Sequence, residues 1–253
     1  MSFDFTRAAI RVADFPVRAI RKIRGVKADY REFLFDDLVI ALSGERPARV
    51  LEIGPKDGLD TRRLVNLSPN LITLAELPDK RSTVEQWLPH ITGAKLEVLY
   101  GNVMYDEAFE SLQPFDVVWC TGVLYHNPEQ LRFIRQLFDL TRPGGRLVLE
   151  SATARRPNTR NENCIELWFP PDEMASGRYH IATNVTHLPS RRAIEAWLTM
   201  VGFTDIQQSR CHSRVTLSLG RDRAAFLARR PIEPTTQTMY YQNVGDYPVG
   251  RAR

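Results

Sequence analysis

Residues 50–58 carry the clearest chemical signal in the sequence. They read Val-Leu-Glu-Ile-Gly-Pro-Lys-Asp-Gly, an apolar run that includes the acidic Glu52 and passes through Gly54 and Gly58 into a helical segment. Glycine lets the backbone approach a ligand closely, and the first turn of a helix offers unpaired N–H groups. The segment therefore predicts a ligand-binding loop, although two glycines also fit a plain strand-to-helix turn.

A second acidic residue, Glu76, ends the next apolar run, about 22 residues after Gly54. In a doubly wound sheet the two strand ends are neighbours, and a carboxylate at the second one can accept both hydroxyls of a ribose. The two strand ends together predict an adenosine-type ligand. The alternative for Glu76 is a solvated strand end.

A nicotinamide dinucleotide fits this loop less well. Its fingerprint is G-x-G-x-x-G, with glycines packed around a pyrophosphate, whereas Lys56 occupies the middle position here. The sequence therefore favours another adenosine cofactor.

The elements that must position these residues alternate between two periodicities. Short apolar runs about 20 to 30 residues apart are typical of βαβ units, and they lie at Val50–Ile53, Leu71–Ala75, Leu96–Leu99, Val117–Cys120 and Leu147–Leu149. Helices are expected between them at Thr61–Leu67, Val84–Leu88 and Gln130–Leu140, and Pro143, Gly144 and Gly145 then turn the chain into the fifth strand. We expect an α/β fold with a doubly wound, mostly parallel, seven-stranded Rossmann-like sheet and helices on both faces.

The rest of the chain divides around this core. Residues 1–48 are expected to be an N-terminal helical cover, with one or two amphipathic helices over 16–42, and 231–253 an irregular tail. Between them, residues 49–230 are expected to form one domain. Within it, 151–190 loses periodicity and is expected to be an insertion with little regular structure. Ordered patterning then predicts a helix at Ser190–Val201, stopped by Gly202, and strands at Phe203–Gln207, Val215–Leu219 and Ala224–Ala228.

Composition places the chain among ordinary globular proteins. Of its 253 residues, 43% are hydrophobic and 25% charged, which excludes a disordered, fibrous or disulfide-scaffold protein. No apolar stretch reaches the roughly 18 residues of a membrane span, and the first residues lack a signal-peptide core, so we expect a cytoplasmic protein. Cys120, Cys164 and Cys211 lack metal-ligand or redox spacing. We therefore expect reduced thiols and no metal site.

Charge is spread unevenly along the chain. Residues 1–27 carry a net charge of +5, residues 28–150 carry −6 and residues 151–253 carry +5. Basic ends can bind a polyanion such as RNA, and a basic N-terminal helix can also lie on an anionic membrane surface. The alternative is a solvated surface.

Further motifs follow the third and fourth strands. The third ends in Tyr100-Gly101-Asn102-Val103, and the fourth leads into Thr121-Gly122-Val123-Leu124-Tyr125-His126. With the loop at 50–58 and Glu76, this order resembles the class I S-adenosylmethionine-dependent methyltransferases, over 49–150 and, with the C-terminal strands, most of 49–230. A shorter likeness, carried by 122–126, Asn184-Val185, Leu188-Pro189-Ser190, Trp197 and Gly202-Phe203, is similar to the branch with the tRNA wobble-uridine enzyme that transfers a carboxymethyl group.

The resemblance implies S-adenosylmethionine as the cofactor and assigns residues to it. Its methionine part would be faced by Glu52, Gly54 and Gly58, its ribose by Glu76, its adenine by Asn102 and Val103, and its sulfonium by Thr121 and Gly122. The sequence departs from the family pattern at Lys56, where glycine is frequent, and at Asn102, where Asp is frequent. The Asn102 side-chain oxygen can still accept from an exocyclic amine.

The implied chemistry asks the protein to align an acceptor and, for a hydroxyl acceptor, to remove its proton. His126 is the candidate base, with a helix cap or a backbone contact as the alternative role. Tyr125 is expected to shape the wall of the site.

The insertion leaves the sheet directly after the fifth strand, so we expect it to cover the acceptor. Arg155, His180 and Asn184 are its candidate acceptor-binding residues. A structural flap is the alternative.

The sequence thus predicts a methyltransferase acting on a small hydroxylated metabolite or saccharide. A tRNA base-modifying methyltransferase, with tRNA as partner, and a non-catalytic cofactor-binding module are the alternatives. The sequence specifies neither the acceptor atom nor the oligomeric state.

Overall fold

The structure is a computed structural model that describes residues 29–109, 111–155, 162–168, 185–216 and 222–233. Seven strands form one sheet in the order β3-β2-β1-β4-β5-β9-β8. The first five strands of this order are parallel to one another, and β9 is antiparallel to both β5 and β8. Along the chain their bounds are β1 Arg49–Ile53, β2 Leu71–Glu76, β3 Lys95–Tyr100, β4 Phe115–Thr121, β5 Thr141–Ala152, β8 Thr204–Ser209 and β9 Arg223–Arg229. The predicted mostly parallel, seven-stranded α/β sheet is confirmed.

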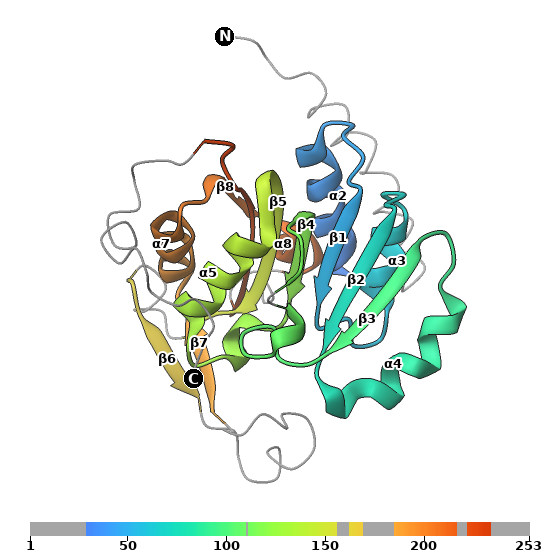
Figure 1. Ribbon diagram of the computed structural model, residues 1–253. Coiled ribbons are helices and arrows are strands. Elements are labelled where there is room, and N and C mark those ends of the chain that lie inside the picture. Colours follow the sequence, from blue (N-terminus) through green and yellow to red (C-terminus); the bar gives the residue numbers. More distant parts are fainter. Residues whose placement is uncertain (1–28, 110, 156–161, 169–184, 217–221, 234–253) are drawn as a thin grey trace.

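Helices cover both faces of this sheet (Figure 1), and each face has its own hydrophobic core. One face packs against α5 and α7, and the other against α2, α3, α4 and α8. Their bounds are α2 Tyr30–Leu42, α3 Leu59–Val65, α4 Arg81–Trp87, α5 Gln130–Leu140, α7 Arg191–Val201 and α8 Cys211–Val215. Short 3-10 turns follow three strands, as η1 Pro78–Lys80 after β2, η3 Glu107–Phe109 after β3 and η4 Leu124–His126 after β4; η2 is Leu88–His90.

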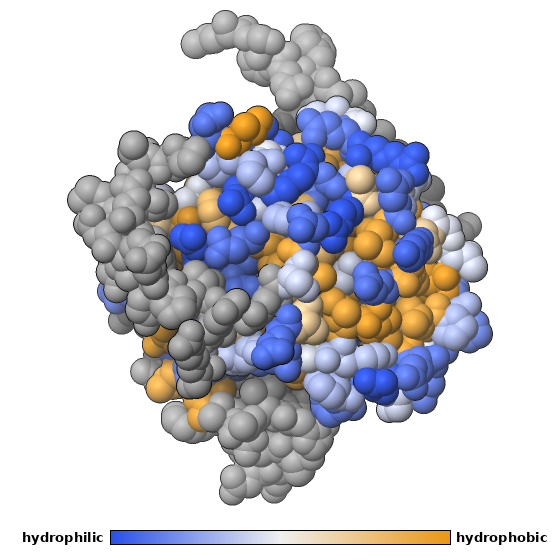
Figure 2. All heavy atoms as spheres, in the orientation of Figure 1, coloured by the Kyte–Doolittle hydropathy of each residue, from blue (hydrophilic) through white to orange (hydrophobic). Residues whose placement is uncertain are grey.

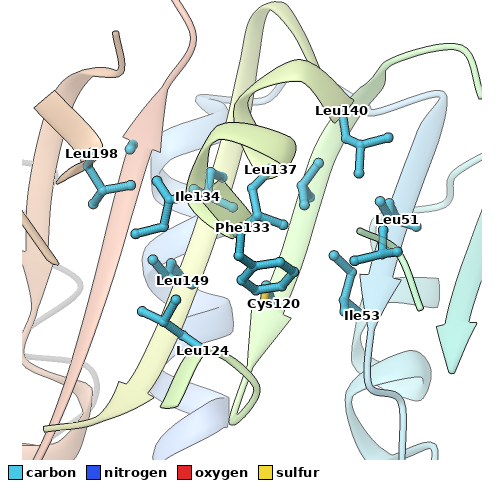
Figure 3. Packing of buried hydrophobic residues seen from close by; sticks show 14 of the residues in the cluster. Leu51, Ile53, Cys120, Leu124, Phe133, Ile134, Leu137, Leu140, Leu149 and Leu198 are labelled. Atoms are coloured by element: carbon cyan, nitrogen blue, oxygen red, sulfur yellow. The ribbon is translucent and has the colours of Figure 1, made fainter. Parts of the chain in front are cut away.

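The core under α5 shows why this sequence forms a two-faced sheet. Phe133, Ile134 and Leu137 recur on one side of α5 and are at most 1% exposed. Figure 3 shows them packed over Cys120 and Leu149, which point to this face from β4 and β5. Because the central strands are buried on both faces, they read in sequence as continuous apolar runs.

Coverage is thinner at the β3 edge of the same face. Between β3 and β4 the described residues form only the short η3. In the space-filling view, hydrophobic residues gather around β3 (Figure 2). The β3 edge of the sheet is therefore less enclosed than the α5 side.

Local signals in the sequence explain the helix ends. Asp29 caps α2, its side chain accepting the Arg31 N–H, and Ser190 caps α7, its side chain accepting the Ala193 N–H. Gly202 ends α7 with a φ of 108°, which confirms the predicted helix stop.

Three sequence expectations need correction. The strand expected at 215–219 is wrong at its start, because Val215 is the last residue of α8; residues 217–219 lie outside the described part. The insertion holds more regular structure than expected, since β6 Ile165–Trp168 and β7 Thr186–Pro189 form an antiparallel hairpin. The turn expected at residues 143–145 is part of β5, which begins at Thr141 and shifts register against β4 there.

Some expectations fall on residues that the structure does not describe. These are residues 16–28 of the helical region expected over 16–42, most of the tail from 231, and the candidate acceptor residues His180 and Asn184. Within the described part, no helix has the length and apolar character needed to cross a membrane. The same part contains no group of three His, Cys, Asp or Glu side chains able to hold a metal ion, and Cys120 and Cys211 are buried.

Candidate functional site

The loop after β1 has the backbone geometry of a ligand-binding turn. Gly54, Lys56 and Gly58 all have positive φ, at 73°, 52° and 71°. A Cβ on Gly58 would lie 2.5 Å from the Trp87 ring, and one on Gly54 would lie 2.9 Å from Val123. Both glycines are therefore required by conformation and by space. Lys56 adopts the same left-handed region with a side chain, which explains how the loop keeps its shape without a middle glycine.

Glu76 closes this loop from the end of β2. Its Oε2 accepts the Lys56 N–H at 3.2 Å and its Oε1 accepts the Leu77 N–H at 2.9 Å. Burial raises the pKa of this carboxyl, and the two backbone N–H groups oppose that rise. Each carboxylate oxygen has a second lone pair, so both can still accept from a diol. The structure thus places Glu76 beside the glycine loop, as the sequence predicts.

The end of β3 is organised by a residue that sequence reasoning missed. Asp106 accepts the Asn102 N–H and lies against Gly101, where a Cβ would be 2.7 Å from its Oδ2. The Asn102 side-chain oxygen accepts the Met104 N–H at 3.0 Å, and Val103 is 7% exposed. Asn102 therefore shapes this turn, and its Nδ2 and the second lone pair of its side-chain oxygen are left to meet a ligand.

Glu52 lies beneath the loop, fully enclosed. It is 1% exposed, and its Oε2 accepts the Thr61 hydroxyl at 2.6 Å. Burial raises its pKa to about 8, against the opposing Thr61 hydrogen bond. At neutral pH the side chain is therefore mostly a neutral acid that ties β1 to α3.

A second buried acid, Asp60, connects α3 to the end of β4. Its Oδ2 accepts from Trp119 Nε1 at 3.1 Å and from Thr121 Oγ1 at 3.0 Å. Its Oδ1 accepts from Arg63 Nη1 at 2.6 Å. Thr121 is therefore held from below, at the carboxyl end of the sheet, and Gly122 follows it with a φ of 75°.

The residues after β4 form the opposite wall. Tyr125 and His126 lie in η4, with ring centroids 4.0 Å apart. Burial, and then the positive charge of Arg223, lower the pKa of His126 to about 4. At neutral pH the imidazole is unprotonated and can accept a proton, although its basicity is weak for a general base.

Beside this wall, the buried Glu150 and the half-buried Arg223 form an ion pair. Arg223 Nη2 donates to Glu150 Oε2 at 2.9 Å, and its Nε donates to Oε1. Glu150 is fully buried; burial alone would raise its pKa, but His212 and Arg223 lower it to about 2. The guanidinium carbon lies 5.6 Å from the Tyr125 ring and 5.9 Å from the Tyr30 ring. A fixed positive charge thus lies close to two aromatic rings, one of them in η4.

The insertion meets the same wall through its hairpin. Gln130 Nε2 donates to the Leu124 carbonyl at 3.2 Å and to the His187 carbonyl at 2.6 Å, which joins η4 to β7. Arg155 is exposed, with its guanidinium 5.2 Å from the Trp168 ring of β6. The hairpin thus lies beside Tyr125 and His126, whereas the Arg155 contact is with the hairpin itself.

The arrangement has two connected halves at the carboxyl ends of the parallel strands, the lower side of the sheet in Figure 1. Glycine turns and Glu76 form the half that suits an adenosine ligand. Thr121, His126 and the Arg223 pair form a polar, partly aromatic half that suits an acceptor or a charged transferred group.

Sequence reasoning missed the buried contacts of this second half. Tyr30, Asp60, Glu150 and Arg223 carried no local motif. One signal was available for Glu150 and Arg223. Glu150 lies near the end of β5 and Arg223 begins a later strand, and two such residues meet when the later strand pairs antiparallel with β5.

Comparisons with known proteins agree with this geometry. A family model described as "Methyltransferase domain" matches residues 25–208. A tRNA U34 carboxymethyltransferase of Desulforapulum autotrophicum is 30% identical over 162 residues, 62% of this chain and 45% of that protein. The enzyme of the same name from Saccharophagus degradans is 26% identical over 219 residues, 86% of this chain and 59% of that protein. The chain therefore spans about half the length of the curated relatives it matches.

Solved structures share the fold at low identity. The N-methyltransferase NodS of Bradyrhizobium japonicum WM9, solved with S-adenosyl-L-homocysteine, aligns with a TM-score of 0.54 at 20% identity, over 79% of this chain and 87% of that one. A Burkholderia thailandensis 1,6-didemethyltoxoflavin-N1-methyltransferase aligns with a TM-score of 0.53 at 19% identity, over 91% of this chain and 92% of that one. At these identities the likeness is one of fold.

Proposed function

The chain belongs to the S-adenosylmethionine-dependent methyltransferase-domain family, and from this premise we propose that it transfers a carboxymethyl group to a uridine base of tRNA. The names of the curated relatives favour the tRNA alternative over the small hydroxylated acceptor that the sequence predicts. The Glu150–Arg223 pair is the structural observation that supports transfer of a carboxymethyl group.

The described residues fit S-adenosylmethionine. The positive-φ turn at Gly54 and Gly58 leaves room for a ligand against bare backbone, and both Glu76 oxygens keep acceptor capacity. In this proposal the glycine loop holds the methionine part, Glu76 the ribose, and Asn102 with Val103 the adenine. When bound, the cofactor supplies a carbon already activated by a sulfonium.

Arg223 is the group that distinguishes a carboxymethyl from a methyl donor. The two transferred groups differ by one carboxylate, and guanidinium is the side chain best matched to a carboxylate. Nε and Nη2 of Arg223 bind Glu150, and Nη1 donates to no group in the described part of the chain. A cation that is fixed in place by its own counterion loses little entropy on binding a second carboxylate.

The acceptor side of the proposal uses the η4 wall. The low pKa of His126 keeps the imidazole unprotonated at neutral pH, so it can hold or accept a proton from the acceptor. Tyr125 offers a flat ring for stacking a base. The basic segments 1–27 and 151–253 can neutralise phosphates of a tRNA.

Product analysis tests the proposal. The full chain is incubated with total tRNA from a strain that lacks its own wobble-uridine enzyme, with isotope-labelled methyl or carboxymethyl sulfonium donors, and the tRNA is digested to nucleosides for mass spectrometry. We expect label in a uridine, more from the carboxymethyl donor, and loss of that preference in Arg223→Gln. Arg229→Gln is the matched control, because Arg229 lies at the far end of β9.

Two outcomes contradict the proposal. Transfer to small hydroxylated compounds with none to tRNA would favour the acceptor class that the sequence alone predicts. Donor binding without transfer to any acceptor would favour the non-catalytic module.

A further inference from the structure

Asp60 is the buried acid that joins the ligand loop to the end of β4. It stands two residues after Gly58 and is 4% exposed. Its carboxylate accepts from Trp119, Thr121 and Arg63, and all three distances lie between 2.6 and 3.1 Å. Burying an ion pair adds little stability over apolar side chains of the same volume. The main effect of Asp60 is therefore the arrangement that it imposes on its hydrogen-bond partners.

That arrangement fixes the direction of one proton. A hydroxyl has a single proton, and a carboxylate can only accept, so Thr121 Oγ1 donates its proton to Asp60. Toward any other neighbour Thr121 is then an acceptor only. Thr121 is 7% exposed at the carboxyl end of β4, whereas Trp119, two residues earlier, is fully buried.

We propose that Asp60 is a positioning residue that makes Thr121 Oγ1 an acceptor directed at the positive charge of a bound sulfonium. The hydrogens on carbons next to a sulfonium are polarised and form weak bonds to oxygen. S-adenosylhomocysteine carries a neutral thioether and would gain much less from such an oxygen. Asp60 thereby favours the charged donor over the spent product.

The same carboxylate also holds the start of α2. Arg31 Nε lies 3.6 Å from Asp60 Oδ2, and Arg63 Nη2 donates to the α2 cap, Asp29, at 2.7 Å. Tyr30 stands between Asp29 and Arg31 in sequence, and the Arg223 guanidinium lies over its ring. Asp60 therefore connects both halves of the site through contacts that span α2, α3 and β4.

Calorimetry with two ligands tests this inference, which rests on the cofactor site of the proposed function and not on its acceptor. The dissociation constants for S-adenosylmethionine and S-adenosylhomocysteine are measured on the full chain and on Thr121→Val, Thr121→Ser and Asp60→Ala. Thr73→Val is the matched control, because it removes a buried hydroxyl that has no hydrogen-bond partner among the described residues.

We expect the preference for the sulfonium ligand to fall about two- to fivefold in Thr121→Val, the size of one weak hydrogen bond. Asp60→Ala lowers it too, because without an acceptor at position 60 the Thr121 hydroxyl proton is free to turn toward the ligand. Thr121→Ser and Thr73→Val keep the wild-type ratio. An equal loss for both ligands in Thr121→Val, or an unchanged ratio, overturns the inference while leaving the cofactor site intact. Failure of the wild-type chain to bind either ligand overturns the cofactor site and the inference with it.

Discussion

Replacing Glu150 by Gln should destabilise the folded protein in a way that depends on pH. The carboxylate is fully buried, and His212 and Arg223 hold its pKa at about 2, from an ordinary value of 4.5, against the burial that would raise it. At about 1.4 kcal/mol for each pKa unit, the ionised form contributes about 3 kcal/mol to the free energy of unfolding at pH 7. A Gln side chain keeps the shape but leaves the Arg223 charge without its partner.

The sign of the pH dependence follows from the depressed pKa. The contribution is fully present above the ordinary pKa and is lost as the pH falls from about 4.5 toward 2. Guanidinium denaturation followed by circular dichroism, at pH 7 and at steps down to pH 3, should show a large deficit for Glu150→Gln at pH 7 that narrows in acid. Glu97→Gln, at an exposed position of β3, is the control and should match the wild type. Equal stability of Glu150→Gln and wild type at pH 7 would refute the reasoning.

Three other perturbations have defined outcomes. His126→Ala should lower turnover about 10- to 100-fold with donor affinity unchanged. Because the pKa of His126 is about 4, the wild-type turnover rate should not fall with a midpoint between pH 6 and 7. A fall with that midpoint would contradict the burial of His126. Gly58→Ala should lower the melting temperature more than Gly44→Ala, although both glycines have positive φ. A Cβ added at Gly58 lies 2.5 Å from the Trp87 ring, whereas one added at Gly44 has no atom within 4 Å. Equal shifts in melting temperature would show that the Trp87 contact is unimportant. Glu52→Gln should flatten the fall in the free energy of unfolding between pH 5 and 8. Burial raises the pKa of Glu52 in the folded protein to about 8, so in this range the carboxyl ionises in the unfolded chain while it stays protonated in the folded one. Denaturation midpoints that change with pH in parallel for variant and wild type would count against this.

The cofactor half could be predicted from the sequence because its signals are local. The glycine turn and Glu76 stand at the ends of apolar runs, and in a parallel sheet the carboxyl ends of neighbouring strands meet at one edge. Fold class followed from the same runs. The hairpin of the insertion was missed because β6 and β7 are only four residues each, and two of the four residues in β6 are exposed.

The acceptor half could not be predicted because its partners are distant in sequence. Arg223 reaches Glu150 only through the antiparallel register that pairs it with Ala152. Asp60 looks like an ordinary first-turn helix residue until Thr121, 61 residues later, donates to it. Val215 begins a β-branched, apolar run that favours a strand locally, yet it packs at the end of α8 against the second core.

The most direct test of the central claim is a binding titration of the wild-type chain and Arg223→Gln with two sulfonium donors, S-adenosylmethionine and its carboxymethyl counterpart. The account predicts that the wild type binds the carboxymethyl donor at least tenfold more tightly, as expected for one charge-assisted pair of about 1.5 kcal/mol or more, and that Arg223→Gln removes this preference while retaining S-adenosylmethionine. Equal affinity of the wild type for both donors, or a preference that survives in Arg223→Gln, would contradict it.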